Sequence, residues 1–134
     1  MNTQIKVLTR RRSHYGLSST LPQSPATIDA LIRDAMRQAP SSFNSQSSRA
    51  VILFGDESGK LWNIVRETLR KIVPADAFAS TDKKIDSFAA AAGTVLFYED
   101  MDTIRQLQES YPLYAENFPV FSEQSGGMAQ LAAV

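Results

Sequence analysis

The chain has 134 residues, 43% of them hydrophobic, which fits a single globular domain, and its 14 basic and 14 acidic side chains leave no overall field that would favour nucleic acid or an anionic membrane. The lack of cysteine excludes disulfides, thiolate nucleophiles and cysteine-ligated metal sites, and the single histidine, His14, excludes a histidine-based metal cluster. No run approaches the ~20 apolar residues of a membrane span and no signal-peptide core opens the chain, so we expect a soluble, cytoplasmic protein.

A short helix is predicted over residues 4–12, with basic side chains at its C-terminal end, where cations suit the helix dipole. Arg10, Arg11 and Arg12 have two interpretations. They form a solvated helix end, or they form a small phosphate clamp with the hydroxyl of Ser13, because guanidinium groups bind phosphate in a fork geometry. We expect His14 to be an ordinary loop residue, since no carboxylate nearby in the sequence would orient it as a base.

A polar segment is the most informative part of the sequence. Ser24 and Pro25 predict the start of a second helix, which must end before Pro40. Residues 40–49 are rich in hydroxyl and amide side chains and lead into the apolar run 50–54. This pattern predicts a polar loop that feeds a buried strand, and such a loop can donate hydrogen bonds to a flat polar ligand or a phosphate. The alternative is that Ser and Asn serve only as turn formers.

The middle of the chain is predicted to be helical up to a second strand. A turn at residues 55–59 starts a helix whose apolar face ends before Pro74. Trp62 on this helix could stack on a ligand, but we favour a half-buried packing role, which is commoner. Residues 75–82 look like a loose polar connection, and residues 83–92 are predicted to form the next helix. The apolar run 93–98 predicts a strand that is buried on both faces.

Three carboxylates, those of Glu99, Asp100 and Asp102, follow this strand. They are compatible with a metal or acid–base site, but we favour a simpler interpretation. Asp100 caps the next helix and Asp102 is an anion in its first turn, which explains both residues without a ligand. The sequence therefore predicts no metal site and no catalytic acid, base or nucleophile.

The last part of the chain combines aromatic and small residues. Four aromatic side chains either cover an apolar pocket or pack within their own loop: Tyr111, Tyr114, Phe118 and Phe121. A helix is predicted from Pro119 onward, and the small residues within it favour a close contact with another helix or subunit. Only two strands are predicted, which make a marginal sheet unless other elements cover it.

Three parts of the sequence are distinctive when taken together. They are the triplet Arg11-Arg12-Ser13, the loop segment APSSFNSQSSR at residues 39–49, and the segments LFYED at 96–100 and PLYAENFPVFSEQS at 112–125. Together they resemble the nitroreductase family of flavoproteins, in particular its short nitroreductase-like, fatty-acid-repression branch. The resemblance extends over essentially the whole chain.

The resemblance implies an α+β fold, a three-layer sandwich with helices around a small central sheet, in a homodimer that binds FMN at two shared sites. It places Arg11, Arg12 and Ser13 at the flavin phosphate and ribityl chain. It places the loop of the other subunit near the isoalloxazine ring, through Pro40, Ser41, Ser42 and Asn44. The implied activity is that of an oxidoreductase that passes hydride from NAD(P)H through the flavin to a nitroaromatic or quinone acceptor, with no obligatory catalytic residue.

The sequence departs from the family in length, because family members are longer. We therefore expect residues 1–134 to form a single nitroreductase-like domain that lacks the usual C-terminal part and leaves the sheet incomplete. An alternative function is a non-catalytic truncated remnant, or an interaction subunit that pairs through its C-terminal helix. An RNA-binding module that uses Arg10, Arg11 and Arg12 would require steeply salt-dependent binding, and we expect neither nucleic acid nor membrane as a partner.

Overall fold

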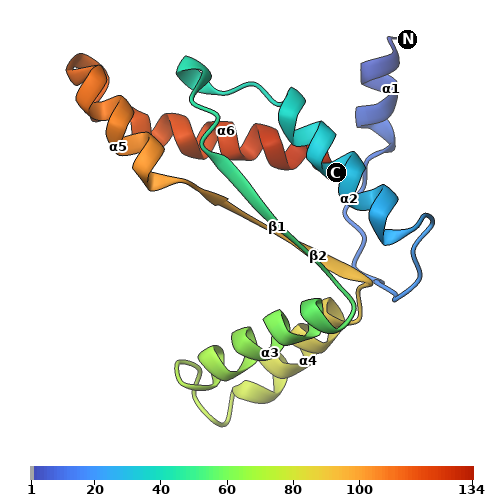
Figure 1. Cartoon of the computed structure of the whole chain (residues 1–134). Coiled ribbons are helices and arrows are strands. Elements are labelled where there is room, and N and C mark those ends of the chain that lie inside the picture. Colours follow the sequence, from blue (N-terminus) through green and yellow to red (C-terminus); the bar gives the residue numbers. More distant parts are fainter. Residues whose placement is uncertain (1) are drawn as a thin grey trace. The chain divides into compact units, whose positions relative to one another are not determined.

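The computed structural model describes residues 2–134, in which helices and two strands alternate (Figure 1). The elements are α1 (Thr3–Arg10), α2 (Pro25–Gln38), η1 (Ser42–Asn44), β1 (Ser48–Phe54), α3 (Asp56–Arg70), α4 (Phe78–Ala89), β2 (Gly93–Glu99), α5 (Met101–Ser110), η2 (Pro112–Tyr114) and α6 (Phe118–Ala133). None of the helices within residues 2–134 is both long enough and apolar enough to span a membrane. The chain has the mixed helix and small-sheet content of the predicted α+β class.

Two compact units make up this structure. One comprises the described part of Met1–Pro22 together with Leu53–Thr94, and the other comprises Gln23–Ile52 together with Val95–Val134. The first unit contains α1, α3 and α4, and the second contains α2, α5, α6 and both short η helices. Each unit also contains a part of both strands.

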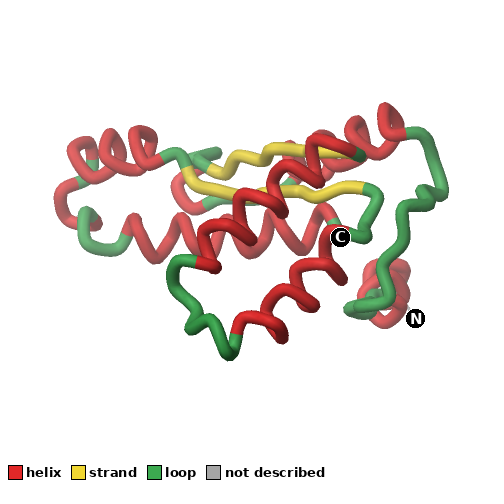
Figure 2. Tube along the Cα trace, turned by 90° about the horizontal axis from the view of Figure 1, so that it is seen from below, coloured by secondary structure: helices red, strands yellow, loops and turns green. Residues whose placement is uncertain are grey.

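The strands pair with each other in a two-stranded sheet (yellow in Figure 2). At one end, the N–H of Asp100 donates to the carbonyl of Ser47 (2.9 Å), and at the other, the N–H of Gly55 donates to the carbonyl of Ala92 (3.1 Å). Residue numbers rise along one strand as they fall along the other, so the strands are antiparallel. In this register Ser48 lies opposite Glu99 on one face, and Val51 lies opposite Leu96 on the other.

The prediction that the second strand is buried on both faces was wrong. Leu96 and Tyr98 are 45% and 51% exposed, and Val51 on the neighbouring strand is 40% exposed. These side chains share one face of the sheet, because side chains two residues apart on a strand point the same way. Within residues 2–134, the strand that contains the apolar run 93–98 is therefore not covered on both faces.

In the first unit, α3 and α4 pack against each other. Trp62 is partly buried as predicted, with its ring 5.3 Å from that of Phe88 and its Nε1 donating to Thr94 Oγ1 (3.0 Å). Arg66 of α3 donates to Asp82 (2.7 Å) and also to Asp86, both on α4. An apolar contact and an ion-pair network thus hold the two helices together.

The start of α4 differs from the prediction. Residues 75–82 were predicted to be a loose connection, but α4 begins at Phe78. The Phe78 ring is 7% exposed and lies under the guanidinium of Arg70, 4.4 Å from it. This contact with the last residue of α3 stabilises an N-terminal helical turn that has no side-chain cap and little sequence signal.

In the second unit, α2 and α6 pack together and α5 packs on α6. Buried apolar side chains supply the core of this unit: Ile32, Ile104, Phe118 and Ala129. Ser24 caps α2 as predicted, since its Oγ accepts from the N–H of Thr27 (3.1 Å). The second unit carries the polar loop that the sequence singled out.

Candidate functional site

The polar loop between α2 and β1 has an unusual backbone. Phe43, Asn44 and Gln46 have φ angles of 57°, 49° and 52°, although none of them is a glycine. A left-handed conformation costs a residue with a side chain about 1–2 kcal/mol, and such residues concentrate at functional sites. The surrounding structure must therefore stabilise this loop.

Hydrogen bonds hold the loop from within and from α6. Ser41 Oγ accepts from the N–H of Gln46 (2.9 Å), which closes the turn. The N–H of Ser42 donates to Ser125 Oγ (3.2 Å), and Ser125 in turn donates to the carbonyl of Phe121 (2.8 Å). Because Ser125 is 1% exposed and lies in α6, it attaches the N-terminal half of the loop to a fixed helix.

Phe43 is the aromatic anchor of the loop. Its ring centroid lies between 5.0 and 6.2 Å from the rings of four other aromatic residues, namely Tyr111, Tyr114, Phe118 and Phe121. Aromatic pairs at such distances contribute about 0.5–1.5 kcal/mol beyond their buried area, which offsets the strain of a left-handed phenylalanine. The aromatic residues thus pack against one another, as one of the two interpretations predicts, while Phe43, Tyr111 and Tyr114 remain about half exposed.

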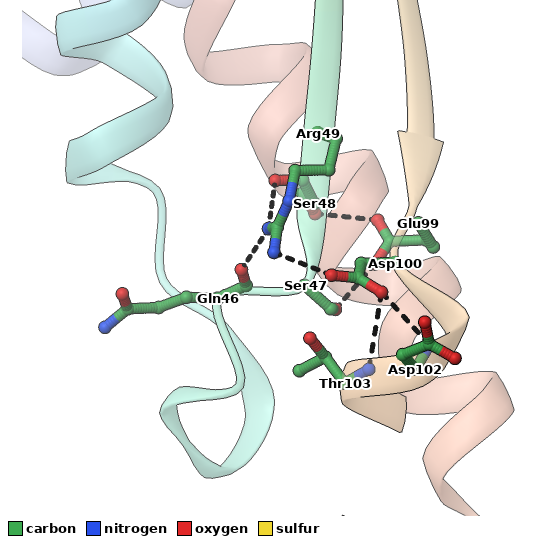
Figure 3. A network of polar contacts seen from close by, with 8 residues as sticks. All are labelled: Gln46, Ser47, Ser48, Arg49, Glu99, Asp100, Asp102 and Thr103. Atoms are coloured by element: carbon green, nitrogen blue, oxygen red, sulfur yellow. Dashed lines mark hydrogen bonds and ion pairs between the residues drawn. The ribbon is translucent and has the colours of Figure 1, made fainter. Parts of the chain in front are cut away.

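The C-terminal end of the loop is fixed by a carboxylate (Figure 3). Ser47 Oγ donates to Glu99 Oε2 (2.6 Å), and Ser48 Oγ donates to Glu99 Oε1 (2.7 Å). Ser47 is completely buried. Hydroxyl groups that donate to an ionised carboxylate form short, strong hydrogen bonds, so both oxygens of Glu99 are used to hold the first residues of β1.

Arg49 and Asp100 form a second set of polar contacts beside those of Glu99 (Figure 3). Arg49 Nη2 pairs with Asp100 Oδ2 (2.9 Å), and Arg49 Nη1 donates to the carbonyl of Gln46 (2.6 Å). Asp100 caps α5, as predicted, by accepting from the N–H groups of Asp102 and Thr103. The hydrogen bond from the backbone of Thr103 lowers the pKa of the Asp100 carboxyl, and the N–H of Asp102 and the charge of Arg49 act in the same direction.

The acidic residues after β2 thus have structural partners. Asp100 is the helix cap, and Asp102 is an acidic residue in the first turn of α5 that also pairs with Arg105. Within residues 2–134, no group of three or more His, Cys, Asp or Glu side chains is placed to hold a metal ion. The interpretation of Asp100 and Asp102 as helix-start residues is confirmed.

A shallow hollow of about 230 Å³ opens beside the loop. It is bordered by the end of α2, the loop, the start of β1 and α6, with Pro40, Ser41 and Gln46 supplied by the loop itself. Binding pockets for drug-sized ligands have volumes of about 300–1,000 Å³. The hollow alone is smaller than that.

The predicted binding residues fall into two groups in the structure. Pro40, Ser41, Ser42 and Asn44 lie together in one turn in the second unit. Arg11, Arg12 and Ser13 directly follow α1 in the first unit and are exposed. Arg12 Nη1 donates to the carbonyls of Thr9 (2.9 Å) and Arg11 (2.8 Å), which stabilises the chain where the helix ends. The role of these residues in binding stays a prediction.

Several residues that shape the loop were not among the predicted site residues, namely Phe43, Gln46, Ser47, Glu99 and Ser125. Ser47 and Glu99 are separated by 52 positions in the chain, and Ser42 and Ser125 by 83. No local pattern predicts such pairs. A weak signal was the hydroxyl run before β1 combined with an acidic residue at the end of β2, because the start of β1 lies beside the end of β2 in the antiparallel sheet.

The chain is similar to known proteins over most of its length. The sequence model of the Nitroreductase family matches residues 8–132. HBN1 of Saccharomyces cerevisiae, which is named as a nitroreductase, is 32% identical over 131 residues, a region that covers 96% of this chain and 65% of HBN1. The chain thus spans slightly less than two thirds of this curated relative.

Solved structures share the fold as well. Nitroreductase CinD from Lactococcus lactis in complex with chloramphenicol superposes with a TM-score of 0.85 at 39% identity, covering 98% of this chain and 66% of CinD. CinD in complex with 4-nitrophenol gives a TM-score of 0.83 at the same identity, covering 98% of this chain and 65% of CinD. The predicted nitroreductase-like fold class is confirmed by these similarities.

Proposed function

Because the chain belongs to the Nitroreductase family, we propose that it is an FMN-dependent oxidoreductase that passes hydride from NAD(P)H through the flavin to nitroaromatic or quinone acceptors. The observation that supports this proposal most strongly is the strained loop at residues 41–46, which is held from both ends and carries exposed polar side chains. Strain that the surrounding structure maintains is typical of a binding site.

The donors of the loop fit the polar edge of a flavin ring, which offers oxygen and nitrogen acceptors. Gln46 Nε2 donates to Asn44 Oδ1 (3.0 Å), which leaves the amide NH₂ of Asn44 as a donor for a ligand. Ser41 accepts a hydrogen bond through Oγ and keeps its hydroxyl proton for donation. The N–H of Ser42 is already used by Ser125, so we expect Ser42 to contribute through its hydroxyl group.

Arg11, Arg12 and Ser13 fit the phosphate end of the same cofactor. All three are exposed, and two guanidinium groups beside a hydroxyl provide the charge and the fork geometry that bind a phosphate. In the homodimer that we propose, this triplet and the loop of the partner subunit bind the same flavin.

The flavin, when bound, supplies the two-electron chemistry, and the protein binds and orients it. The rigid attachment of the loop to α6 and Glu99 gives the Ser41, Ser42 and Asn44 side chains fixed positions before any ligand arrives. A preorganised site does not have to order its donors during binding, which favours affinity.

The proposed class of electron acceptors is based on the ligands of related nitroreductases. CinD was solved with chloramphenicol and with 4-nitrophenol, and both ligands carry a nitro group on an aromatic ring. We propose that this chain accepts nitroaromatic compounds of similar size. Quinones are proposed as alternative acceptors because they also take up two electrons and are planar.

A homodimer in the cytoplasm completes the proposal. Exposed apolar side chains on α6 support a subunit contact, since Val120 and Leu131 are each 53% exposed. Sedimentation velocity at several protein concentrations tests the assembly. We expect a species with the mass of two chains, and a monomer at all concentrations would contradict the homodimer.

The activity has a direct test. The purified full chain is incubated with FMN, passed through a desalting column, and then assayed for oxidation of NADH or NADPH with 4-nitrophenol or a benzoquinone. We expect a yellow protein with a flavin spectrum and acceptor-dependent consumption of the nucleotide. A colourless and inactive protein after incubation with FMN would contradict the proposal and favour a non-catalytic remnant or interaction subunit.

A further inference from the structure

We propose that Glu99 is a positioning residue that fixes the flavin-binding loop through Ser47 and Ser48, an inference that rests on the proposed function. Glu99 lies at the end of β2, and neither its sequence context nor the family resemblance assigns it a role in binding. Each oxygen of its carboxylate accepts a hydrogen bond from a serine hydroxyl group, with Oγ–Oε distances of 2.6 and 2.7 Å. Both donors come from the two residues that directly follow the strained loop.

The connection from Glu99 to the loop is short. Ser47 is bonded to Gln46, which has a φ of 52°, and Asn44 lies only two residues before Gln46. The Ser47 carbonyl accepts from the N–H of Asp100 (2.9 Å), so side chain and backbone of Ser47 are held at once. A rotation of this residue would change the path of the chain at Gln46 and Asn44.

The loop is attached to the rest of its unit at few points. Near its N-terminal end the Ser42 N–H reaches Ser125 on α6, Phe43 is packed among aromatic rings, and at its C-terminal end the hydroxyls of Ser47 and Ser48 reach Glu99. Arg49 contributes a further bond to the Gln46 carbonyl (2.6 Å) but is itself partly exposed. Glu99, which is itself partly buried, therefore provides a polar attachment at one end of the loop through the completely buried Ser47.

Helix α6 is shaped to admit this carboxylate. A Cβ atom on Gly126 would lie 2.8 Å from Glu99 Oε1, which is closer than real Cβ contacts. Glu99 also borders a hollow of about 290 Å³ with Glu123, Gly126 and Gln130 of α6. The carboxylate thus fits between the first residues of β1 and a helix surface that has a glycine at the point of contact.

The inference is tested with Glu99→Ala, Glu99→Gln and a matched control, Glu123→Gln. Glu123 borders the same hollow but is exposed on α6. The first measurement is hydrogen exchange of the loop amides in the FMN-free full chain, and the second is the dissociation constant for FMN. Thermal unfolding is recorded for every variant, so that a loss of overall stability is measured separately.

We expect Glu99→Ala to raise the exchange rate of the Asn44 and Gln46 amides. We also expect it to weaken FMN binding about tenfold, because the bound conformation of the loop loses the stabilisation of about one charge-assisted hydrogen bond. Glu99→Gln should rescue part of the loss, because an amide can accept from one serine while donating to the other after its hydroxyl rotates. Glu123→Gln should leave both measurements unchanged.

A combined variant tests whether Glu99 acts through the two serines. In a chain that already carries Ser47→Ala and Ser48→Ala, the further change Glu99→Ala should weaken FMN binding less than about twofold, because coupled residues are not additive. A full tenfold loss in that background would overturn the proposed route.

The possible failures are distinguishable. If wild-type protein binds FMN and Glu99→Ala binds it equally well, with unchanged exchange in the loop, the positioning role is wrong and the proposed function stands. If the wild-type chain binds no FMN, the proposed function is wrong, and exchange at Asn44 and Gln46 in Glu99→Ala still decides whether Glu99 positions the loop.

Discussion

At the scale of single residues, the loop before β1 combines strain with polar side chains. Phe43 is stabilised by aromatic packing, and asparagine tolerates a left-handed backbone better than most residues do, so Asn44 needs less support. Gln46 has neither advantage, although its φ is 52°. The strain at Gln46 should therefore be measurable.

Replacing Gln46 by glycine should stabilise the protein. Glycine adopts positive φ without steric cost, and we expect Gln46→Gly to raise the free energy of unfolding by about 0.5 kcal/mol after the larger entropy of the unfolded chain is included. The control is Gln124→Gly in the helical part of α6, which should lower the free energy of unfolding by about 1 kcal/mol. Urea unfolding measures both, and a loss of stability in both variants would contradict a strained Gln46.

The environment of Asp100 lowers its pKa and should therefore make the stability of the protein depend on pH. Its hydrogen bonds from Thr103 and Asp102 and its ion pair with Arg49 lower its pKa below the ordinary value of 3.8. A carboxyl group with a lowered pKa in the folded state stabilises the fold above its unfolded pKa, and this stabilisation is lost as the pH falls through the folded pKa.

Asp100→Asn separates charge from capping, because asparagine also caps helices well. We expect the variant to be less stable than wild type at pH 7 and at pH 5 by the same amount. The difference should shrink as the pH falls below about 3.8. Chemical unfolding at each pH measures it, and a stability difference that stays constant down to pH values well below 3 would show that the charge of Asp100 has no part in it.

At the scale of elements, two adjacent glycines of α6 have opposite roles. A Cβ on Gly126 would meet the Glu99 carboxylate at 2.8 Å, whereas nothing lies within 4 Å of a Cβ on Gly127. Alanine normally stabilises a helix relative to glycine by about 0.8–1.0 kcal/mol. The two positions therefore provide a matched pair.

Gly127→Ala should raise the melting temperature, and Gly126→Ala should lower it, because the new methyl group displaces Glu99 from Ser47 and Ser48. Gly126→Ala should also weaken FMN binding in the same direction as Glu99→Ala. Differential scanning calorimetry and an FMN titration measure these effects. Equal stabilisation by both alanines would mean that α6 does not pack closely against the carboxylate.

The elements themselves were largely predictable from local sequence. Ser24, Pro25 and Asp100 are strong helix-start residues, and the apolar runs located both strands to within two residues. Phe78 shows where this approach fails. The Phe78 ring contacts Arg70, a residue of the preceding helix, and local propensity contains no information about that contact.

The candidate site was predictable only in part, for the same reason. The hydroxyl and amide composition of residues 40–49 identified the loop, but the left-handed backbone depends on Tyr111, Phe118, Ser125 and Glu99, all of which are far away in the sequence. Their roles follow from the fold and not from the spacing of residues.

At the scale of the whole molecule, the two segments that the sequence singled out are predicted to bind one cofactor. The triplet at residues 11–13 and the loop at residues 40–44 belong to different compact units. That residues 1–134 form a single nitroreductase-like domain stays a prediction, as does the homodimer in which the two segments serve one flavin. The chain spans 65% of HBN1 and 66% of CinD.

An FMN titration followed by flavin fluorescence tests whether both segments bind one FMN. Wild-type protein should bind one FMN per chain, Arg12→Ala and Ser42→Ala should each weaken binding about tenfold, and the control Arg105→Ala on α5 should bind as wild type does. If the double variant Arg12→Ala/Ser42→Ala binds FMN as tightly as wild type, the assignment of these residues to a flavin site is wrong.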